Sequence, residues 1–272
     1  MLRPVEQIRR VRGGAQSHLK RCDDGYYYVV KFQNNPQHRR ILVNELLGTR
    51  LAARLGLPTV RAVSAVAEEL IRLTPDLAVE LPRARIPCQP GLQFGSRYPG
   101  DPRQLTMRDF LPDEQLPEVE NLHDFAGMLM FDKWTCNTNG RQTVFFSEQR
   151  QAAEQAVVRY KTRMIDRGFC FNAGEWNFPD APLRGLYARN RVYLGVTGIE
   201  SFAPWLERIE KQMTERTLDE ISRAISPEWY ADDCGAAAAR TTAPAAVPRA
   251  GPDSGGQEMQ APAVSELDVN HE

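Results

Sequence analysis

The sequence has little that would mark it as a membrane, secreted or zinc-dependent protein. No stretch of its 272 residues reaches the roughly 18 consecutive apolar residues that a membrane-spanning helix needs. Its five cysteines are an odd number and form no C-x-x-C pair, which argues against a disulfide framework or a zinc ribbon. The four histidines form no H-x-x-H pattern, and the net charge is only −1. These absences predict a globular, cytoplasmic protein with no membrane partner.

Charge and composition divide the chain unevenly. Residues 231–272 are rich in Ala, Pro, Gly and Ser and carry a net charge of −5, which predicts a disordered tail. The remaining body is therefore +4, and its first 65 residues hold twelve Lys or Arg against four acids. This excess favours a part that binds anions such as phosphates, although a solvated basic face explains it equally well. The modest body charge and the lack of an aromatic-basic motif disfavour nucleic-acid binding.

The N-terminal half begins with strand patterns and continues with a helix. Residues Tyr26–Phe32 (YYYVVKF) are aromatic and β-branched and follow the turn signal Asp23-Asp24-Gly25, so they predict a strand that ends a hairpin. The run RRILVNELLGTRLAARLGLP has leucines at helical spacing and ends in Gly56 and Pro58, as a helix terminus should. Residues 59–73 alternate weakly, which is consistent with further strands.

The second half is predicted to be mainly helical, beyond a long connection. Residues Pro82–Pro117 are rich in Pro and Gly and predict a link between two lobes. The apolar spacing predicts two helical regions, Leu122–Trp134 and Phe202–Ile225, and two strands, Thr143–Ser147 and Val157–Ile165.

A glycine loop and a charged pair are the first candidate site residues. Gly13, Gly14, Ala15 and Gln16 are mostly small, so their backbone N–H groups can approach phosphate oxygens, although a Gly-Gly pair is more often a flexible turn. Lys31 lies inside an apolar strand, where an unpaired ammonium is costly to bury. Glu45 on the following helix is its candidate partner, as in protein kinases, and the alternative is a lysine that faces solvent.

Two later segments carry acidic and amide side chains that suit phosphoryl transfer. In FDKWTCNTNGRQ, Asp132 and Asn137 have the D-x-x-x-x-N spacing of a kinase catalytic loop, with the Asp as proton acceptor and the Asn as magnesium ligand. In MIDRGF, Asp166 follows an apolar run and precedes a glycine, as a metal-binding Asp of the D-F-G type does. Each pattern alone is common, and Asp166 also fits an ordinary turn.

The order of these features along the chain is more specific than any one of them. A glycine loop, a strand Lys, a helix Glu, a D-x-x-x-x-N segment and a strand-ending Asp occur in the order found in kinase folds. With GGAQ, the YVVKF strand, NELLGTRLAARLGLP, CNTNGRQ and MIDRGF, the sequence resembles the HipA-like kinase family over residues 11–171.

This resemblance implies ATP- and Mg²⁺-dependent transfer of a phosphoryl group to a protein Ser or Thr, and so a protein substrate or regulatory partner. By position, the GGAQ backbone would cover the phosphates, Lys31 would contact them and Glu45 would orient Lys31. Asp166 would bind the metal. The implied fold is α+β and bilobal, with a small sheet-rich lobe at residues 1–85 and a larger, mainly helical lobe at residues 86–230.

The catalytic loop departs from the family pattern N-x-D-x-H. If Asn137 is the first residue of that pattern, the proton-acceptor position is occupied by Asn139, and an amide cannot accept a proton as a carboxylate does. This alignment predicts a pseudokinase that binds nucleotide or a partner without catalysis. In the other alignment Asp132 is the proton acceptor and Asn137 a metal ligand, which predicts an active kinase. The sequence leaves both open.

Overall fold

The computed structural model describes residues 2–38, 40–74, 77–139, 143–148, 159–179, 181 and 184–230. The tail predicted for residues 231–272 lies outside the described residues. The structure confirms mixed α and β secondary structure with a sheet-rich N-terminal part.

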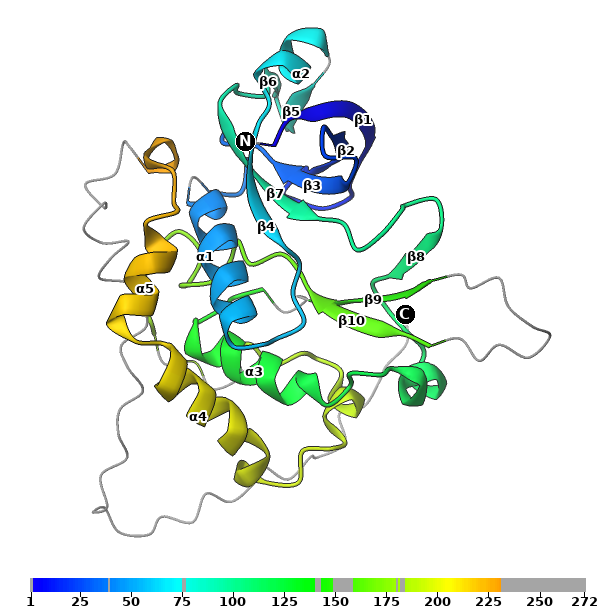
Figure 1. Ribbon diagram of the computed structural model, residues 1–272, viewed down its shortest axis with the longest axis vertical. Coiled ribbons are helices and arrows are strands. Elements are labelled where there is room, and N and C mark those ends of the chain that lie inside the picture. Colours follow the sequence, from blue (N-terminus) through cyan, green and yellow to red (C-terminus); the bar gives the residue numbers. More distant parts are fainter. Residues whose placement is uncertain are drawn as a thin grey trace, which may run out of the picture.

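An antiparallel five-stranded sheet forms the N-terminal part (Figure 1). Its strands, in spatial order, are β1 (Pro4–Arg10), β2 (His18–Cys22), β3 (Tyr27–Lys31), β7 (Leu92–Arg97) and β4 (Ala62–Val66).

The predicted hairpin joins β2 to β3. Gly25 adopts φ +81° in the turn, and the Tyr28 hydroxyl donates to the Asp24 carboxylate. Because positive φ strains residues that have a Cβ, glycine suits this turn.

The predicted helix is α1 (Ile41–Arg54). It ends as expected: Gly56 has φ +77°, and the Leu57 N–H donates to the Ala52 carbonyl across the last turn. Residues 59–73 contain β4, but then a short helix, α2 (Glu68–Leu73), in place of more strands.

The prediction of a long connection over residues 82–117 is wrong. The segment contains three strands: β6 (Ala84–Pro87), β7 and β8 (Leu105–Arg108). Strand β6 pairs with β5 (Ala78–Leu81) in a two-stranded sheet. Pro82 and Gly91 lie between these strands. Strand β7 was missed because its interior residue Gln93 is polar; the Gln93 amide is fully buried and bonds to nearby backbone. The lobe boundary at residue 85 stays a prediction, and the pairing of β7 favours a later boundary.

The C-terminal part combines helices with a small sheet. The α-helices are α3 (Asp124–Trp134), α4 (Ala203–Gln212) and α5 (Glu215–Ser222), in the regions that the sequence predicted. Strands β8, β9 (Thr143–Glu148) and β10 (Lys161–Met164) form an antiparallel sheet in the order β10-β9-β8. Short 3-10 helices complete it: Asp113–Glu118, Asn190–Tyr193, Ile199–Phe202 and Pro227–Trp229.

One large apolar core joins the two parts through α1. Leu46 of α1 packs in the same buried cluster as Phe94 of β7, Phe131 of α3, Phe145 of β9 and Met164 of β10. Helix α1 therefore lies between the five-stranded sheet and the C-terminal helices (Figure 1). No helix in the described part of the chain is long and apolar enough to cross a membrane.

A buried lysine in β2 links the free energy of unfolding to pH in the alkaline range. Lys20 is fully buried, donates to the Gln7 side chain at 2.7 Å and lies 5.4 Å from the centroid of the Phe32 ring. Burial lowers the pKa of Lys20 to about 8. The unfolded chain, in which the lysine has its ordinary pKa of 10.5, then binds more protons than the folded chain between these two values.

We therefore expect the contribution of Lys20 to the free energy of unfolding, taken as the difference between the wild type and a Lys20→Met variant, to rise by on the order of 3 kcal/mol as pH increases from about 8 to 10.5. Burial raises the pKa of the Cys22 and Cys88 thiols, which act in the opposite direction in both proteins. The Lys20→Met variant should lose this rise and be more stable than the wild type at pH 7. Urea unfolding at several pH values measures both effects. A Lys161→Met variant, changed at an exposed lysine, is the control. Equal pH dependence in wild type and Lys20→Met would contradict the assignment.

Candidate functional site

Three charged side chains from distant parts of the chain meet in the interior. The Lys31 ammonium donates to the Glu45 carboxylate and, at 2.5 Å, to Oδ1 of Asp166. Lys31 and Glu45 are only 6% and 2% exposed, so the alternative of a solvent-facing lysine is excluded. Burial alone would lower the pKa of Lys31, but the Glu45 and Asp166 carboxylates outweigh it and hold this pKa above its ordinary value. The site therefore keeps a permanent cation.

Each member of this charged group is fixed by its own element. Lys31 is the last residue of β3, and Glu45 lies in the second turn of α1. Asp166 follows β10 and has φ +59°, a left-handed conformation that is uncommon outside glycine and concentrates at functional sites. The second Glu45 oxygen accepts the backbone N–H of Arg167 at 2.9 Å. Glu45 thus holds both the lysine and the segment that carries Asp166.

The neighbour of Glu45 fastens the segment after Asp166 to α1. The Asn44 side chain is fully buried, and its Oδ1 accepts the indole N–H of Trp176 at 2.8 Å. Its amide nitrogen lies 2.7–2.9 Å from the backbone carbonyls of Gly168, Cys170 and Ala173. The adjacent residues Asn44 and Glu45 therefore hold Lys31 of β3 and the segment after Asp166 against α1.

Helix α1 approaches this segment so closely that glycine is required on both sides. A Cβ added at Gly48 would lie 2.8 Å from the Arg167 Cβ, and one added at Gly168 would lie 2.4 Å from Cγ1 of Ile41. Both distances are shorter than carbon atoms can approach without displacement. The glycine of the MIDRGF motif is thus explained by packing against α1.

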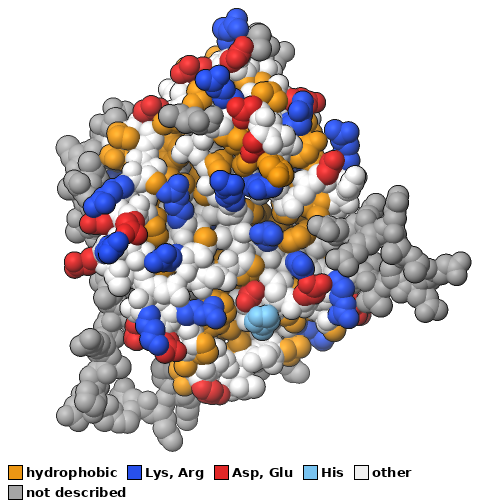
Figure 2. Space-filling model, in the orientation of Figure 1, with side chains coloured by type: hydrophobic (Ala, Val, Ile, Leu, Met, Phe, Trp, Pro, Cys, Tyr) orange, Lys and Arg blue, Asp and Glu red, His pale blue; other side chains and the backbone are white. Residues whose placement is uncertain are grey.

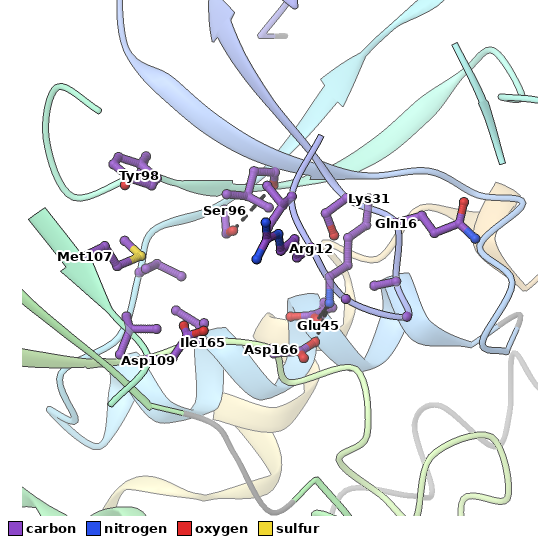
Figure 3. Close-up of a pocket in the computed structure, with 18 of the residues that line it drawn as sticks. Arg12, Gln16, Lys31, Glu45, Ser96, Tyr98, Met107, Asp109, Ile165 and Asp166 are labelled. Atoms are coloured by element: carbon purple, nitrogen blue, oxygen red, sulfur yellow. Dashed lines mark hydrogen bonds and ion pairs between the residues drawn. The ribbon is translucent and has the colours of Figure 1, made fainter. Parts of the chain in front are cut away.

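A pocket of about 220 Å³ opens beside Lys31 and Asp166. Figure 3 shows the charged group at one side of it, Tyr98, Met107, Asp109 and Ile165 at the other, and Arg12 and Ser96 between them. The glycine loop lines it, and so do the cations Arg9 and Arg97 and the apolar Val11, Val29, Val60 and Val144. The pocket therefore has the Lys31–Glu45–Asp166 group at one end and apolar side chains together with Asp109 at the other.

The far end of this pocket contains residues that the sequence patterns did not reveal. Ser96 and Arg97 end β7, and Tyr98 and Pro99 follow it; the strand lies in the segment that was taken for a connection. Asp109 follows β8 in the same segment. The signal that could have found them is the run LQFGSRYP, in which Leu92, Phe94 and Tyr98 fall on the same face of an extended strand.

The glycine loop has the backbone that its sequence predicts. Gly13 adopts φ +131° and Gln16 φ +48°, and the Gln16 N–H donates to the Gly13 carbonyl at 3.1 Å. Gly14 and Ala15 complete the lining of the pocket on this side. The Gln16 amide group, however, bonds to the backbone of Glu80 in β5.

The two candidates for the proton acceptor lie in different surroundings. The Asn139 amide nitrogen is 3.2 Å from Oδ2 of Asp166, beside the pocket. Asp132 is 2% exposed, and its Oδ1 accepts from Arg167 at 2.8 Å and from the Asn137 amide at 2.9 Å. Burial raises the pKa of Asp132 to about 6, although Arg167 and Asn137 act in the opposite direction. None of Asp132, Asn137 and Asn139 lines the pocket, and Asn139 is next to it only through its contact with Asp166.

The structure thus brings together the glycine loop, Lys31, Glu45, Asp166 and Asn139, and it places Asp132 and Asn137 behind them. Among the described residues, no three His, Cys, Asp or Glu side chains gather into a metal site. A magnesium ion held mainly by phosphates and water needs only one or two protein ligands, so this donor set suits it. Asp166 and an asparagine oxygen are the residues that could supply them.

Comparison with known proteins agrees with this geometry. A model for a family described as HipA-like kinase matches residues 5–149, which is more than half of the chain. The chain belongs to the HipA-like kinase family. The match includes the glycine loop, Lys31, Glu45 and Asn139 and stops before Asp166. A search among curated protein sequences finds no match.

Solved structures show which fold this HipA-like chain shares. A Helicobacter pylori proinflammatory kinase, CtkA, superposes with a TM-score of 0.51 at 12% identity, over 83% of this chain and 85% of that one. The Golgi casein kinase gives a TM-score of 0.45 at 12% identity, over 88% of this chain and 69% of that one. The superposition on CtkA confirms the fold prediction in part, as a fold shared with a kinase, and the division into two lobes stays a prediction.

Proposed function

We propose that this HipA-like chain binds ATP with Mg²⁺ in the pocket and transfers the γ-phosphoryl group to a protein Ser or Thr. The observation that carries the proposal is the buried Lys31 ammonium, bonded to Glu45 and Asp166, at the end of a pocket lined by a glycine loop. A fixed cation, backbone N–H groups and a carboxylate around one cavity are what a triphosphate with a divalent metal requires.

The two ends of the pocket set the direction of the nucleotide. The triphosphate would lie at the Lys31 end, where Arg12 also enters the pocket (Figure 3). The base would lie among Val29, Val144 and Ile165, near the backbone of Ser96–Pro99. Lys and Arg side chains are also numerous across the middle of the face shown in Figure 2, which favours approach of an anionic ligand.

The metal would be held by Asp166 together with an asparagine oxygen, either from Asn137, as the D-x-x-x-x-N spacing suggests, or from Asn139, which contacts Asp166. Bound Mg²⁺ would neutralise charge on the β- and γ-phosphates. Lys31 lowers the pKa of Asp166, against the effect of burial, so this carboxylate is ionised and able to act as a ligand at neutral pH.

The transfer step needs positioning more than covalent chemistry. The acceptor hydroxyl oxygen forms a bond to the γ-phosphorus, the bond from that phosphorus to the β–γ bridging oxygen breaks, and ADP leaves. The hydroxyl proton passes to an oxygen of the transferred phosphoryl group and from there to solvent. Lys31 and the glycine loop hold the phosphates, and Glu45 holds Lys31.

The finer parts of the proposal rest on the family and the composition. The five-stranded sheet and the C-terminal helices would act as two lobes with ATP between them. Membership of the HipA-like kinase family supports a protein acceptor. The odd number of cysteines favours a cytoplasmic location.

Calorimetry with ATP, with and without Mg²⁺, followed by a transfer assay with radiolabelled ATP, tests this function. We expect saturable binding that Mg²⁺ strengthens, and label on the chain itself or on an added protein. Absence of binding under both conditions would reject the proposal.

The Asp166→Ala variant tests the metal role. Removing the carboxylate should abolish the difference between ATP affinities measured with and without Mg²⁺. Asp113→Ala is a matched control, because Asp113 pairs with Arg189 and Arg191 outside the pocket. Full Mg²⁺ dependence in Asp166→Ala would contradict the assignment.

A nucleotide-binding pseudokinase is the second candidate function. The observation that favours it is the Asn139 amide beside Asp166, with the nearby carboxylate of Asp132 buried against Arg167. Binding of Mg²⁺–ATP without transfer to any protein would support this candidate.

A further inference from the structure

The glycine loop is fastened to a hairpin that lies outside the pocket. Oε1 of Gln16 accepts the backbone N–H of Glu80 at 2.7 Å, and Nε2 of Gln16 donates to the Glu80 carbonyl at 2.5 Å. The side-chain amide therefore pairs with both polar backbone groups of one residue of β5, as a neighbouring strand would. No residue of the β5–β6 hairpin lines the pocket.

Other contacts limit the ways in which the loop can move. Oε1 of Gln16 also accepts from Arg10 at 2.5 Å, and the Ala15 carbonyl accepts from the Asn35 side chain at 2.9 Å. Figure 3 shows the Gln16 side chain directed away from Lys31 and Asp166. The amide group thus faces the hairpin, whereas the backbone of the same residue belongs to the loop beside the pocket.

We infer that Gln16 is a positioning residue, which fixes the glycine loop over the phosphates by pairing with Glu80 of the β5–β6 hairpin. This inference deepens the proposed function and rests on it. Gln16 has φ +48° and Gly13 φ +131°, and Gly13 in particular has a wide choice of backbone conformations. Without the bonds to Glu80, the loop would sample conformations in which its N–H groups point elsewhere, and ordering it would lower phosphate affinity.

The hairpin holds Glu80 from both of its strands. Its inner residues Ala78 and Val79 are buried, whereas all four residues of β6 are exposed and Ile86 is 43% exposed. Arg85 of β6 pairs with the Glu80 side chain at 3.1 Å. A displacement of β6 would thus reach Glu80 and, through it, the loop.

The test compares variants that break the pairing with variants that keep it. Gln16→Ala removes the amide. Glu80→Pro removes the N–H that Gln16 accepts and is placed in an edge strand that tolerates proline. Glu80→Ala keeps both backbone groups, and Gln33→Ala changes another half-buried glutamine, which bonds to the Leu92 carbonyl away from the loop.

Calorimetry should show affinity for Mg²⁺–ATP lowered by about tenfold or more in Gln16→Ala and Glu80→Pro, with affinity for adenosine changed less than about twofold. A general loss of stability would weaken both ligands, so the contrast separates positioning from folding. Glu80→Ala and Gln33→Ala should resemble the wild type. Wild-type affinity for Mg²⁺–ATP in Gln16→Ala would overturn the inference.

A second measurement does not depend on nucleotide. Arg12 is exposed in the loop, so trypsin should cleave after Arg12 faster in Gln16→Ala and Glu80→Pro than in the wild type. Equal cleavage rates would show that the pairing does not hold the loop. If the wild type binds no ATP, the proposed function and the positioning role both fail, while faster cleavage would still show that the pairing fixes the loop.

Discussion

Replacing Lys31 by methionine is expected to lower the affinity for Mg²⁺–ATP by on the order of a hundredfold. The ammonium is the buried cation of the pocket that bonds to both carboxylates of the charged group. Methionine preserves most of the side-chain volume but offers no donor to a phosphate. Calorimetry with ATP and Mg²⁺ measures the loss.

The same substitution also threatens the fold. Glu45 is 2% exposed, and a buried carboxylate that loses its cation typically costs about 3–5 kcal/mol. A Lys31→Met/Glu45→Gln double variant removes this problem, because glutamine is neutral and its oxygen can still accept the Arg167 N–H. We expect the double variant to recover the wild-type melting temperature but not the affinity. A folded double variant with wild-type affinity for Mg²⁺–ATP would reject the role of Lys31.

Replacing Asp132 by asparagine is expected to lower the free energy of unfolding by about 3–5 kcal/mol. Arg167 is fully buried and loses its carboxylate partner, whose oxygen lies 2.8 Å from the guanidinium. Urea unfolding measures this effect. Glu220→Gln, at an exposed ion pair with Arg216, should leave the free energy of unfolding nearly unchanged.

An Asp132→Leu/Arg167→Met double variant separates a structural carboxylate from a proton acceptor. It removes both buried charges with side chains of similar size, so stability should recover. Because Asp132 does not line the pocket, we expect the recovered protein to keep its phosphoryl-transfer rate to within about tenfold. A folded double variant whose transfer rate falls by a hundredfold or more would identify Asp132 as the proton acceptor. Asn139→Ala, by contrast, should affect transfer without a comparable loss of stability.

Local patterns predicted the elements whose ends are marked by nearby residues. The leucine spacing and Gly56 placed α1, and the turn signal before Tyr26 placed the β2–β3 hairpin, because helix ends and tight turns depend on nearby residues. Strand β7 was missed because its interior position in the sheet is defined by β3 and β4, its partners on either side. No apolar pattern predicts that Gln93 is buried. Its side chain can be buried because it bonds to the backbone of Gln33 and Gln89, and these contacts form only in the folded chain.

The amino-acid order alone determined which residues are candidates: a glycine loop, a lysine in a strand, a glutamate on the next helix and an aspartate before a glycine. Only the tertiary structure decided which of them meet. Lys31 and Asp166 are 135 positions apart, and their contact depends on how closely α1 packs against the segment after β10. The spacing of Asp132 and Asn137 matches a catalytic loop. Both side chains are nevertheless buried, Asp132 against Arg167, and neither lines the pocket. Spacing along a chain fixes which side chains are present, but burial and pairing decide which of them can meet a ligand.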